Sequence, residues 1–246
     1  MGSSSLRDTI AARLADVRAR LARAAARAGR DPASVRLIAV SKTFPIDHVR
    51  AAYAAGQTLF GENRVQEALE KMSLSSDKAI EWHLIGHLQS NKARRAGASF
   101  SCIHSIDSVD LLRRVNDAAA GAFRQLDVLV QVDLGGEPTK HGALPGTLEP
   151  IFEAGRACQA ARIVGLMVLP PFLADPEDVR PYFRRLRALR DGLAGRGVVP
   201  SMLRELSMGM SHDFEVAIEE GATLIRVGSA IFGERTLPLS GGSSPG

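Results

Sequence analysis

The chain has 246 residues, of which 45% are hydrophobic and 24% are charged. This balance is typical of a globular protein that can bury a large core. The 31 basic and 27 acidic residues leave a net charge of only +4, and aromatic residues make up 5% of the chain. A nucleic-acid interface usually combines clustered basic charge with stacking aromatic rings, so we expect no nucleic-acid partner. The sequence contains no apolar run of about 18 residues and no signal-peptide core, so we expect a soluble, cytoplasmic protein with no membrane partner.

The patterns that would indicate a metal site are weak, and we expect none. Cys102 and Cys158 lie far apart and outside any CxxC motif, so buried free thiols in a reducing compartment are expected. His83 and His87 are four residues apart, as in a helical zinc motif, but that motif requires Glu after the first His, where this chain has Leu84.

The predicted elements alternate along the chain. The first helix is predicted from Leu6 to Ala28, ending at Gly29. Eight strand candidates follow, at Val35–Ser41, Thr58–Gly61, Glu81–Ile85, Cys102–Ile106, Asp127–Asp133, Ile163–Leu169, Glu205–Ser207 and Thr223–Val227. Helical patterning separates them, for example at Ile46–Ala55, Val65–Met72, Val109–Ala120, Leu148–Ala160, Pro176–Leu193 and Phe214–Glu220. The Gly/Ser-rich ends, residues 1–5 and 240–246, are predicted to be disordered tails of one domain spanning residues 6–235.

Strict alternation of strands and helices indicates a parallel sheet. Runs such as residues 37–40 and 128–132 are nearly continuously apolar, as expected for strands covered on both faces. Eight such units in about 200 residues favour a single-domain (β/α)8 TIM barrel with an extra N-terminal helix. A doubly wound sheet is the alternative, but no GxGxxG motif opens any predicted helix.

Polar residues gather at the carboxyl ends of the predicted strands, where (β/α)8 barrels carry their active sites. Lys42 follows the first strand and Asn63 the second. His83 lies in the third strand and is included as a candidate, with a hydrogen-bonded core histidine as the favoured alternative. The last two strands contribute Ser207, Gly209, Ser211, Gly228 and Ser229. We expect these residues to converge on one mouth of the barrel.

The two Ser/Gly loops after the seventh and eighth strands predict a phosphate site. They read LSMGMS at 206–211 and RVGSA at 226–230. Glycines allow backbone N–H groups to approach an anion, hydroxyl groups add donors, and these two loops are a recurrent phosphate cradle in this fold. Helix capping by Ser and Gly is the alternative, and the pairing of two such loops favours phosphate.

Lys42 and Arg226 are the charged candidates. A lysine amine attacks an aldehyde only when unprotonated, which partial burial at the barrel mouth favours; a solvated charge is the alternative for Lys42. Arg226 lies in an apolar strand, where arginine is rare unless paired. It could face a pyridine nitrogen and keep that nitrogen unprotonated, or form a salt bridge with Glu205 or Glu234, and the sequence leaves both open.

At these motifs the sequence resembles the pyridoxal phosphate homeostasis protein family, which is related to the barrel domain of alanine racemase. The matching stretches are AVSKT at 39–43, GEN at 61–63, VQEA at 65–68, WHLIG at 82–86, LQSNK at 88–92, GLM at 165–167, LSMGMS at 206–211 and RVGSAIFGER at 226–235. Two positions depart from the family pattern, with Arg64 where it usually has Tyr and His87 where it usually has Pro. Both positions lie near the predicted mouth.

The resemblance implies that pyridoxal 5′-phosphate (PLP) is the cofactor and that Lys42 is its Schiff-base lysine. It implies that Ser207, Gly209, Gly228 and Ser229 surround the phosphate, that Arg226 faces the ring nitrogen and that Asn63 lies beside the ring. The family role is intracellular PLP (vitamin B6) homeostasis by a monomer that holds PLP and delivers it transiently to apo-enzymes, without an established turnover reaction.

Two other functions compete with this interpretation. A PLP-dependent amino-acid racemase needs a second acid/base group, which two-domain racemases take from another domain; the only tyrosines here, Tyr53 and Tyr182, fall in helical patterns. A phosphosugar enzyme would use the same phosphate cradle without a covalent role for Lys42, and would form no coloured adduct.

Overall fold

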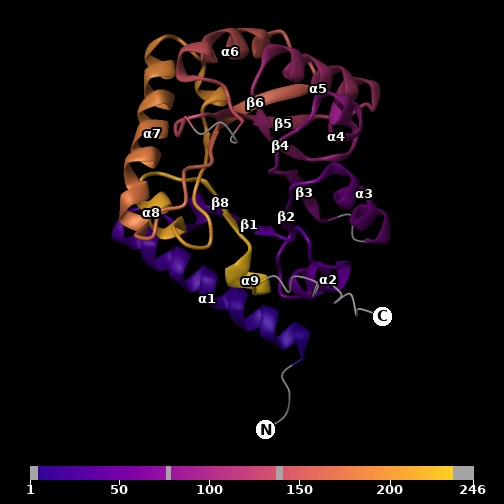
Figure 1. The fold of residues 1–246 in the computed structure, drawn as a ribbon, viewed down its shortest axis with the longest axis vertical. Helices are drawn as coiled ribbons and strands as arrows, with labels where there is room; N and C mark the ends of the chain where they lie inside the picture. Colours follow the sequence, from indigo (N-terminus) through magenta and orange to yellow (C-terminus); the bar gives the residue numbers. More distant parts are fainter. Residues whose placement is uncertain (1–4, 76–78, 137–140, 235–246) are drawn as a thin grey trace, which may run out of the picture.

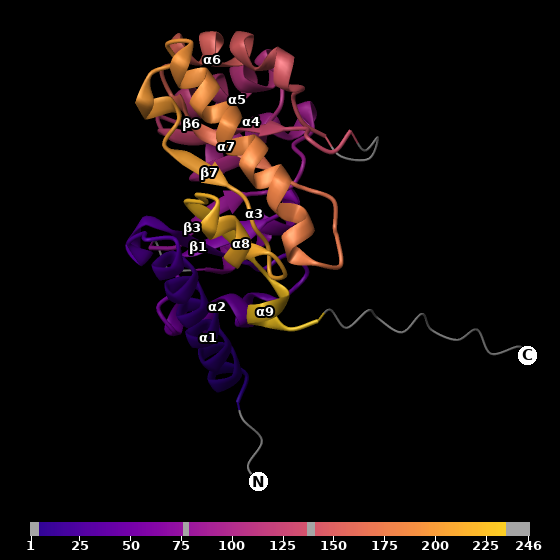
Figure 2. The same cartoon turned by 90° about the vertical axis from the view of Figure 1, so that its left-hand side faces the viewer.

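The eight predicted strands form a closed parallel barrel, which confirms the expected fold. The structure is a computed structural model that describes residues 5–75, 79–136 and 141–234. The strands follow one another around the barrel and β8 pairs with β1, for example Arg226 beside Ile38. Figures 1 and 2 show the strands inside and the helices around them. The strands are β1 Arg36–Val40, β2 Leu59–Glu62, β3 Glu81–Leu84, β4 Cys102–Ile106, β5 Leu126–Val132, β6 Ala161–Val168, β7 Glu205–Ser207 and β8 Leu224–Val227.

In the described part of the chain, seven helices lie in the connections between strands, one precedes the first strand and one follows the last, with some differences from the expected bounds. They are α1 Leu6–Arg27, α2 Ile46–Ala54, α3 Val65–Leu74, α4 Ala93–Ser99, α5 Val109–Gly121, α6 Leu148–Arg156, α7 Arg180–Gly195, α8 Phe214–Glu219 and α9 Ser229–Phe232. The sequence patterns did not predict α4, because its seven residues are too few for a clear periodicity. Helix α6 ends earlier than expected: the Asn116 side chain accepts bonds from the backbone N–H groups of residues 159–161 and holds that segment in a turn. Among the described residues, none of the helices is both long enough and apolar enough to cross a bilayer.

The N-terminal helix α1 is an addition to the barrel and packs on its outside. Ile10, Leu14, Val17 and Leu21 are buried at a spacing of three or four residues, which gives the helix one apolar face. That face contacts α2, α8 and α9 (Figures 1 and 2). Ser5 belongs to this helix as its N-cap, because its side chain accepts a bond from the Asp8 amide. The rest of the predicted tails, residues 1–4 and 240–246, lies outside the described residues.

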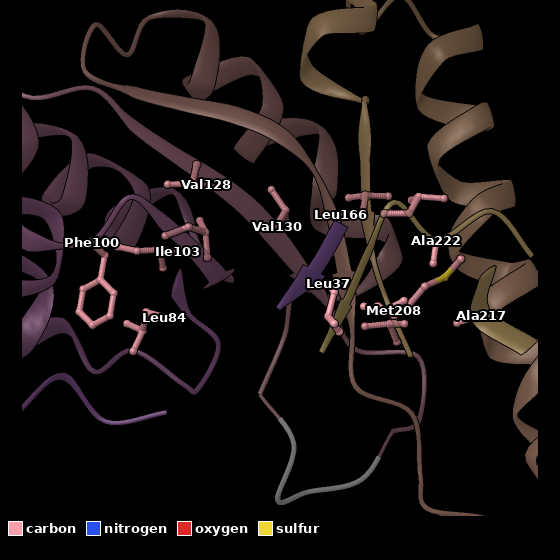
Figure 3. Packing of buried hydrophobic residues seen from close by; sticks show 14 of the residues in the cluster. Leu37, Leu84, Phe100, Ile103, Val128, Val130, Leu166, Met208, Ala217 and Ala222 are labelled. Atoms are coloured by element: carbon pink, nitrogen blue, oxygen red, sulfur yellow. The ribbon is translucent and has the colours of Figure 1, made fainter. Parts of the chain in front are cut away.

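Buried side chains form two groups on the two sides of the barrel wall. The larger group fills the space between strands and helices and includes Leu84, Ile103, Val128 and Leu166 (Figure 3). The smaller group, the inner cluster, lies inside the barrel. It consists of Ile38, Cys102, Leu129, Val164, Met167 and Leu224. Successive strand residues point to opposite sides, so the residues that alternate with the outer group point into the barrel.

Candidate functional site

A cavity of about 650 Å³ lies at the carboxyl ends of strands β1, β2, β7 and β8. This volume suits a small organic ligand. Six of the nine predicted site residues line it: Lys42, Asn63, Ser211, Arg226, Gly228 and Ser229. The other three, His83, Ser207 and Gly209, do not line it and lie deeper in the structure. The strand ends therefore bring together residues that are up to 187 positions apart, Lys42 and Ser229.

Lys42 is held in a short turn between β1 and α2. The preceding residue, Ser41, is fully buried, and its hydroxyl group donates to Glu62 Oε1 over 2.6 Å. The following residue, Thr43, has a positive φ of 69°, which is disfavoured for a β-branched residue. Lys42 itself is half-buried and lines the cavity. The turn thus fixes where the lysine side chain leaves the backbone.

The loop after β7 is shaped so that Ser211 reaches the cavity. Gly209 has a φ of +92°, and a Cβ atom there would lie only 2.6 Å from the Ala217 Cβ, so this position requires glycine. The buried Asp213 carboxylate accepts a bond from the Met210 amide at 2.6 Å and tightens the loop. Gly209 therefore lets the loop turn closely against α8, and the loop places Ser211 at the cavity.

Ser211 also joins the two Ser/Gly loops. Its hydroxyl oxygen accepts bonds from the backbone amides of Gly228, at 3.0 Å, and Ala230, at 3.4 Å. Ser211 and Gly228 line the cavity, so this hydroxyl group lies at its edge with both backbone amides bonded to its oxygen. Because its oxygen accepts from both amides, the hydroxyl group can donate its own hydrogen to an anion such as a phosphate.

Arg226 lines the cavity and is otherwise buried, with 3% of its surface exposed. Its guanidinium group donates to the Ser207 hydroxyl and, over 2.9 Å, to the Val168 carbonyl. Burial lowers the pKa of Arg226 to about 10, so the side chain remains cationic at neutral pH. Among the described residues it forms no ion pair, and Glu205 instead pairs with Arg36 at 3.0 Å. Neither of the alternative salt bridges, with Glu205 or with Glu234, is therefore formed.

Ser207 and His83 belong to a hydrogen-bonded chain inside the barrel. The Ser207 Oγ lies 2.8 Å from His104 Nδ1, and His104 Nε2 lies 3.0 Å from His83 Nδ1. Burial lowers the pKa of His83 to about 3 and holds the pKa of His104 well below its usual value, so both rings are neutral. The Ser207 hydroxyl thus accepts a hydrogen bond from Arg226. His83 is a hydrogen-bonded core histidine, the alternative that the sequence favoured.

The same interior region contains the only group of described residues whose ligand atoms could surround a metal ion. Atoms of His83, Cys102 and His104 lie within 4.8 Å of one another, and all three side chains are buried. The two imidazole rings already bond to each other, and burial raises the pKa of the Cys102 thiol well above its usual value. In this arrangement the rings serve as hydrogen-bond partners.

Asn63 presents an acceptor atom without a partner. Its side-chain Oδ1 is buried and forms no hydrogen bond with any described residue, and such an atom is costly unless a ligand or water satisfies it. Gly86 packs against this residue, since a Cβ atom there would lie 2.3 Å from the Asn63 carbonyl oxygen. Asn63 is therefore held firmly at the cavity wall.

The sequence patterns did not predict the apolar part of the cavity wall or a partly buried cluster of charged residues beside Lys42. The wall includes Val40, Phe44, Ile85, Leu169, Phe172 and Met210. The cluster consists of Glu62, Glu67 and Lys71. Lys71 could have been noticed, because it falls at three-residue spacing after Val65 and Ala68 on the buried face of α3.

The two departures from the family pattern lie outside the cavity lining. Arg64 is the exposed N-cap residue of α3. The His87 ring stacks on the His141 ring with centroids 3.5 Å apart, and its Nδ1 lies 3.9 Å from Asp107 Oδ2. Burial and the neighbouring His141 lower the pKa of His87.

Comparison with known proteins identifies the relatives of this chain. The alanine racemase N-terminal domain family matches residues 12–236. The pyridoxal phosphate homeostasis protein of Aquifex aeolicus is 46% identical over 91% of this chain and 97% of its own length. The solved structure of PipY from Synechococcus elongatus with PLP bound is 41% identical, with a TM-score of 0.80 over 91% of this chain and 100% of that chain. An alanine racemase from Clostridium difficile shares the fold, with a TM-score of 0.72 at 12% identity over 94% of this chain and 58% of that chain. From the length and level of these matches, the chain belongs to the pyridoxal phosphate homeostasis protein family.

Proposed function

We propose that this protein binds PLP in the cavity, holds it through a Schiff base on Lys42 and serves PLP homeostasis. The observation that carries the proposal is that one cavity combines a lysine, a buried arginine and a serine hydroxyl group held between the two Ser/Gly loops. PLP offers a matching group to each: an aldehyde, a ring nitrogen and a phosphate. The relative PipY, whose solved structure contains PLP, supports the same ligand.

The covalent step needs no further reagent. The unprotonated Lys42 Nζ adds to the aldehyde carbon, and loss of one water molecule leaves a carbon–nitrogen double bond. The Ser211 hydroxyl would donate to the phosphate, with Gly228 and Ser229 beside it. The Gly228 and Ala230 amides would orient that hydroxyl group by donating to its oxygen. Asn63 Oδ1 would gain a partner on the ligand or an ordered water.

Arg226 favours holding PLP over using it in catalysis. When bound, PLP supplies an electron sink that stabilises carbanions, and this property is strongest when the ring nitrogen is protonated. The cationic Arg226 guanidinium group at that nitrogen would oppose its protonation. Tyr53 on α2 and Tyr182 on α7 are not among the residues that line the cavity, so neither supplies the second acid/base group of a racemase.

The finer parts of the proposal concern location and delivery. The protein acts as a monomer in the cytoplasm and passes PLP transiently to apo-enzymes, which contributes to vitamin B6 homeostasis. The name of the Aquifex relative supports the role in homeostasis. The two unpaired cysteines, Cys102 and Cys158, support a reducing compartment such as the cytoplasm.

The test is the absorbance of the protein mixed with PLP, followed by borohydride reduction and peptide mapping. The chain has only five lysines, Lys42, Lys71, Lys78, Lys92 and Lys140, so the map is simple. We expect a yellow adduct at Lys42 that is lost in Lys42→Ala and kept in the control Lys92→Ala, whose lysine is exposed. Labelling scattered over the other lysines would reject the proposal and favour a phosphosugar ligand. Racemisation of amino acids by the loaded protein would reject the carrier role.

A further inference from the structure

Lys71 is a buried lysine whose three N–H donors are all used. Its Nζ lies 2.7 Å from Glu62 Oε1, 2.9 Å from Glu67 Oε1 and 2.8 Å from the Ser41 carbonyl oxygen. The side chain is 7% exposed, and a lysine this buried requires such partners. The cluster connects α3, β2 and the end of β1.

The bonds of this cluster converge on the two residues that flank Lys42. On one side, the Ser41 carbonyl accepts from Lys71, and the Ser41 hydroxyl donates to Glu62. On the other side, the Thr43 backbone amide donates to Glu67 Oε1 over 2.6 Å. The turn that carries Lys42 is therefore held both before and after the lysine.

The contact to Thr43 acts on a backbone conformation that would otherwise be disfavoured. Thr43 is exposed and has a φ of 69°, a region that β-branched residues rarely adopt. Such a conformation persists only where surrounding contacts impose it, and it is common at functional sites. The Glu67 carboxylate supplies the contact.

The charge state of the cluster suits this task. Burial alone would raise the pKa of Glu67, but the hydrogen bonds from Lys71 and Thr43 bring the pKa below its usual value. Glu67 thus remains a carboxylate at neutral pH, and an ionised acceptor forms the stronger hydrogen bond to the Thr43 amide.

We propose that Glu67 and Lys71 are positioning residues that hold the Ser41–Thr43 turn so that the Lys42 amine faces the aldehyde of the ligand. This inference rests on the proposed function, since it concerns how Lys42 reaches PLP. Neither Glu67 nor Lys71 lines the cavity, so both act through the backbone on either side of Lys42.

The first experiment compares PLP with pyridoxine 5′-phosphate, which has the same ring and phosphate but no aldehyde. In Glu67→Ala we expect the equilibrium constant for adduct formation at Lys42 to fall about tenfold, which corresponds to the loss of one charge-assisted hydrogen bond. Pyridoxine 5′-phosphate should bind within about twofold of the wild type. Glu70→Ala, an exposed position on the same helix, is the matched control and should leave both ligands unaffected.

Two further variants separate positioning from general stability. Glu67→Gln keeps an oxygen acceptor for the Thr43 amide and should recover part of the lost adduct formation. Thr43→Gly accepts a positive φ without strain, so Glu67→Ala should cost clearly less in a Thr43→Gly background than in the wild type.

The outcomes are distinct. Equal weakening of both ligands in Glu67→Ala, or no weakening of adduct formation, would overturn the positioning role and leave the cluster as a structural ion pair. Simple additivity of the effects of Glu67→Ala and Thr43→Gly would also overturn the positioning role. If the wild type forms no adduct at Lys42, the proposed function fails and the inference falls with it.

Discussion

Ser207 Oγ lies 2.8 Å from His104 Nδ1 and accepts a hydrogen bond from the Arg226 guanidinium group. The chain of hydrogen bonds continues through His104 to His83. All its members except Arg226 are neutral, since burial holds the pKa values of both histidines low. Arg226 is thereby oriented without having its charge neutralised by a carboxylate, and its positive charge remains available to a ligand in the cavity.

Replacing Ser207 with Ala should destabilise the protein. The change removes the shared partner of Arg226 and His104 and leaves both groups buried and incompletely bonded. We expect the free energy of unfolding in urea to fall by about 1–3 kcal/mol. Ser73→Ala, at an exposed hydroxyl on α3, should change it by less than about 0.5 kcal/mol. Wild-type stability in Ser207→Ala would show that these hydrogen bonds do not support Arg226.

Replacing Ser211 with Ala should affect anion binding more than stability. Ser211 is half-buried and lies between the two Ser/Gly loops. Loss of its hydroxyl group removes one contact to a phosphate, which corresponds to a loss in affinity of about three- to tenfold. The dissociation constant of inorganic phosphate, obtained from its competition with PLP by absorbance, measures this loss. An unchanged dissociation constant in Ser211→Ala would place the anion elsewhere.

Acid should destabilise the fold through the buried histidines. Burial lowers the pKa of His83 to about 3, below its usual value near 6.5, and the pKa of His104 shifts in the same direction. The unfolded chain therefore binds protons below about pH 6.5 that the folded chain does not, and stability falls as pH decreases toward about 3. Each histidine contributes a slope of up to about 1.4 kcal/mol per pH unit.

Urea unfolding between pH 7 and pH 4 measures this slope. His83→Gln should reduce the slope by up to about 1.4 kcal/mol per pH unit, which corresponds to one proton. His212→Gln, at an exposed position, should leave the slope unchanged. An identical slope in His83→Gln and the wild type would contradict the assignment.

Glu220 should matter more for stability than the exposed acids around it. Its carboxylate is 5% exposed and pairs with three arginines of α7, Arg180 at 2.9 Å, Arg184 at 3.0 Å and Arg187 at 3.1 Å. Glu220→Gln leaves these guanidinium groups without their shared carboxylate, and we expect the free energy of unfolding to fall by about 1–3 kcal/mol. Glu177→Gln, at a side chain that is 58% exposed, should cost less than about 1 kcal/mol. Equal effects would show that burial does not strengthen the network.

Local sequence patterns determined the elements of this protein. The alternation of short, mostly apolar segments with helical patterning predicted all eight strands to within one or two residues, because strands covered on both faces are largely apolar. The position of Lys42 directly after one such run predicted a side chain at the barrel mouth, and it lines the cavity there. The quoted motifs indicated the family, which the relatives confirm.

The tertiary structure decided which of the polar residues meet. Ser207 and Ser211 look alike in the motif LSMGMS, yet Ser207 ends strand β7 and points to Arg226, whereas the turn at Gly209 carries Ser211 to the cavity. The direction of a strand side chain depends on parity and register across the closed barrel, which a local pattern does not contain. Lys71 likewise meets Glu62 and the Ser41 carbonyl only because α3 packs beside strands β1 and β2. Sequence by itself determined the strands, most of the helices and the candidate lysine, and the packing of distant segments decided which neighbours surround that lysine.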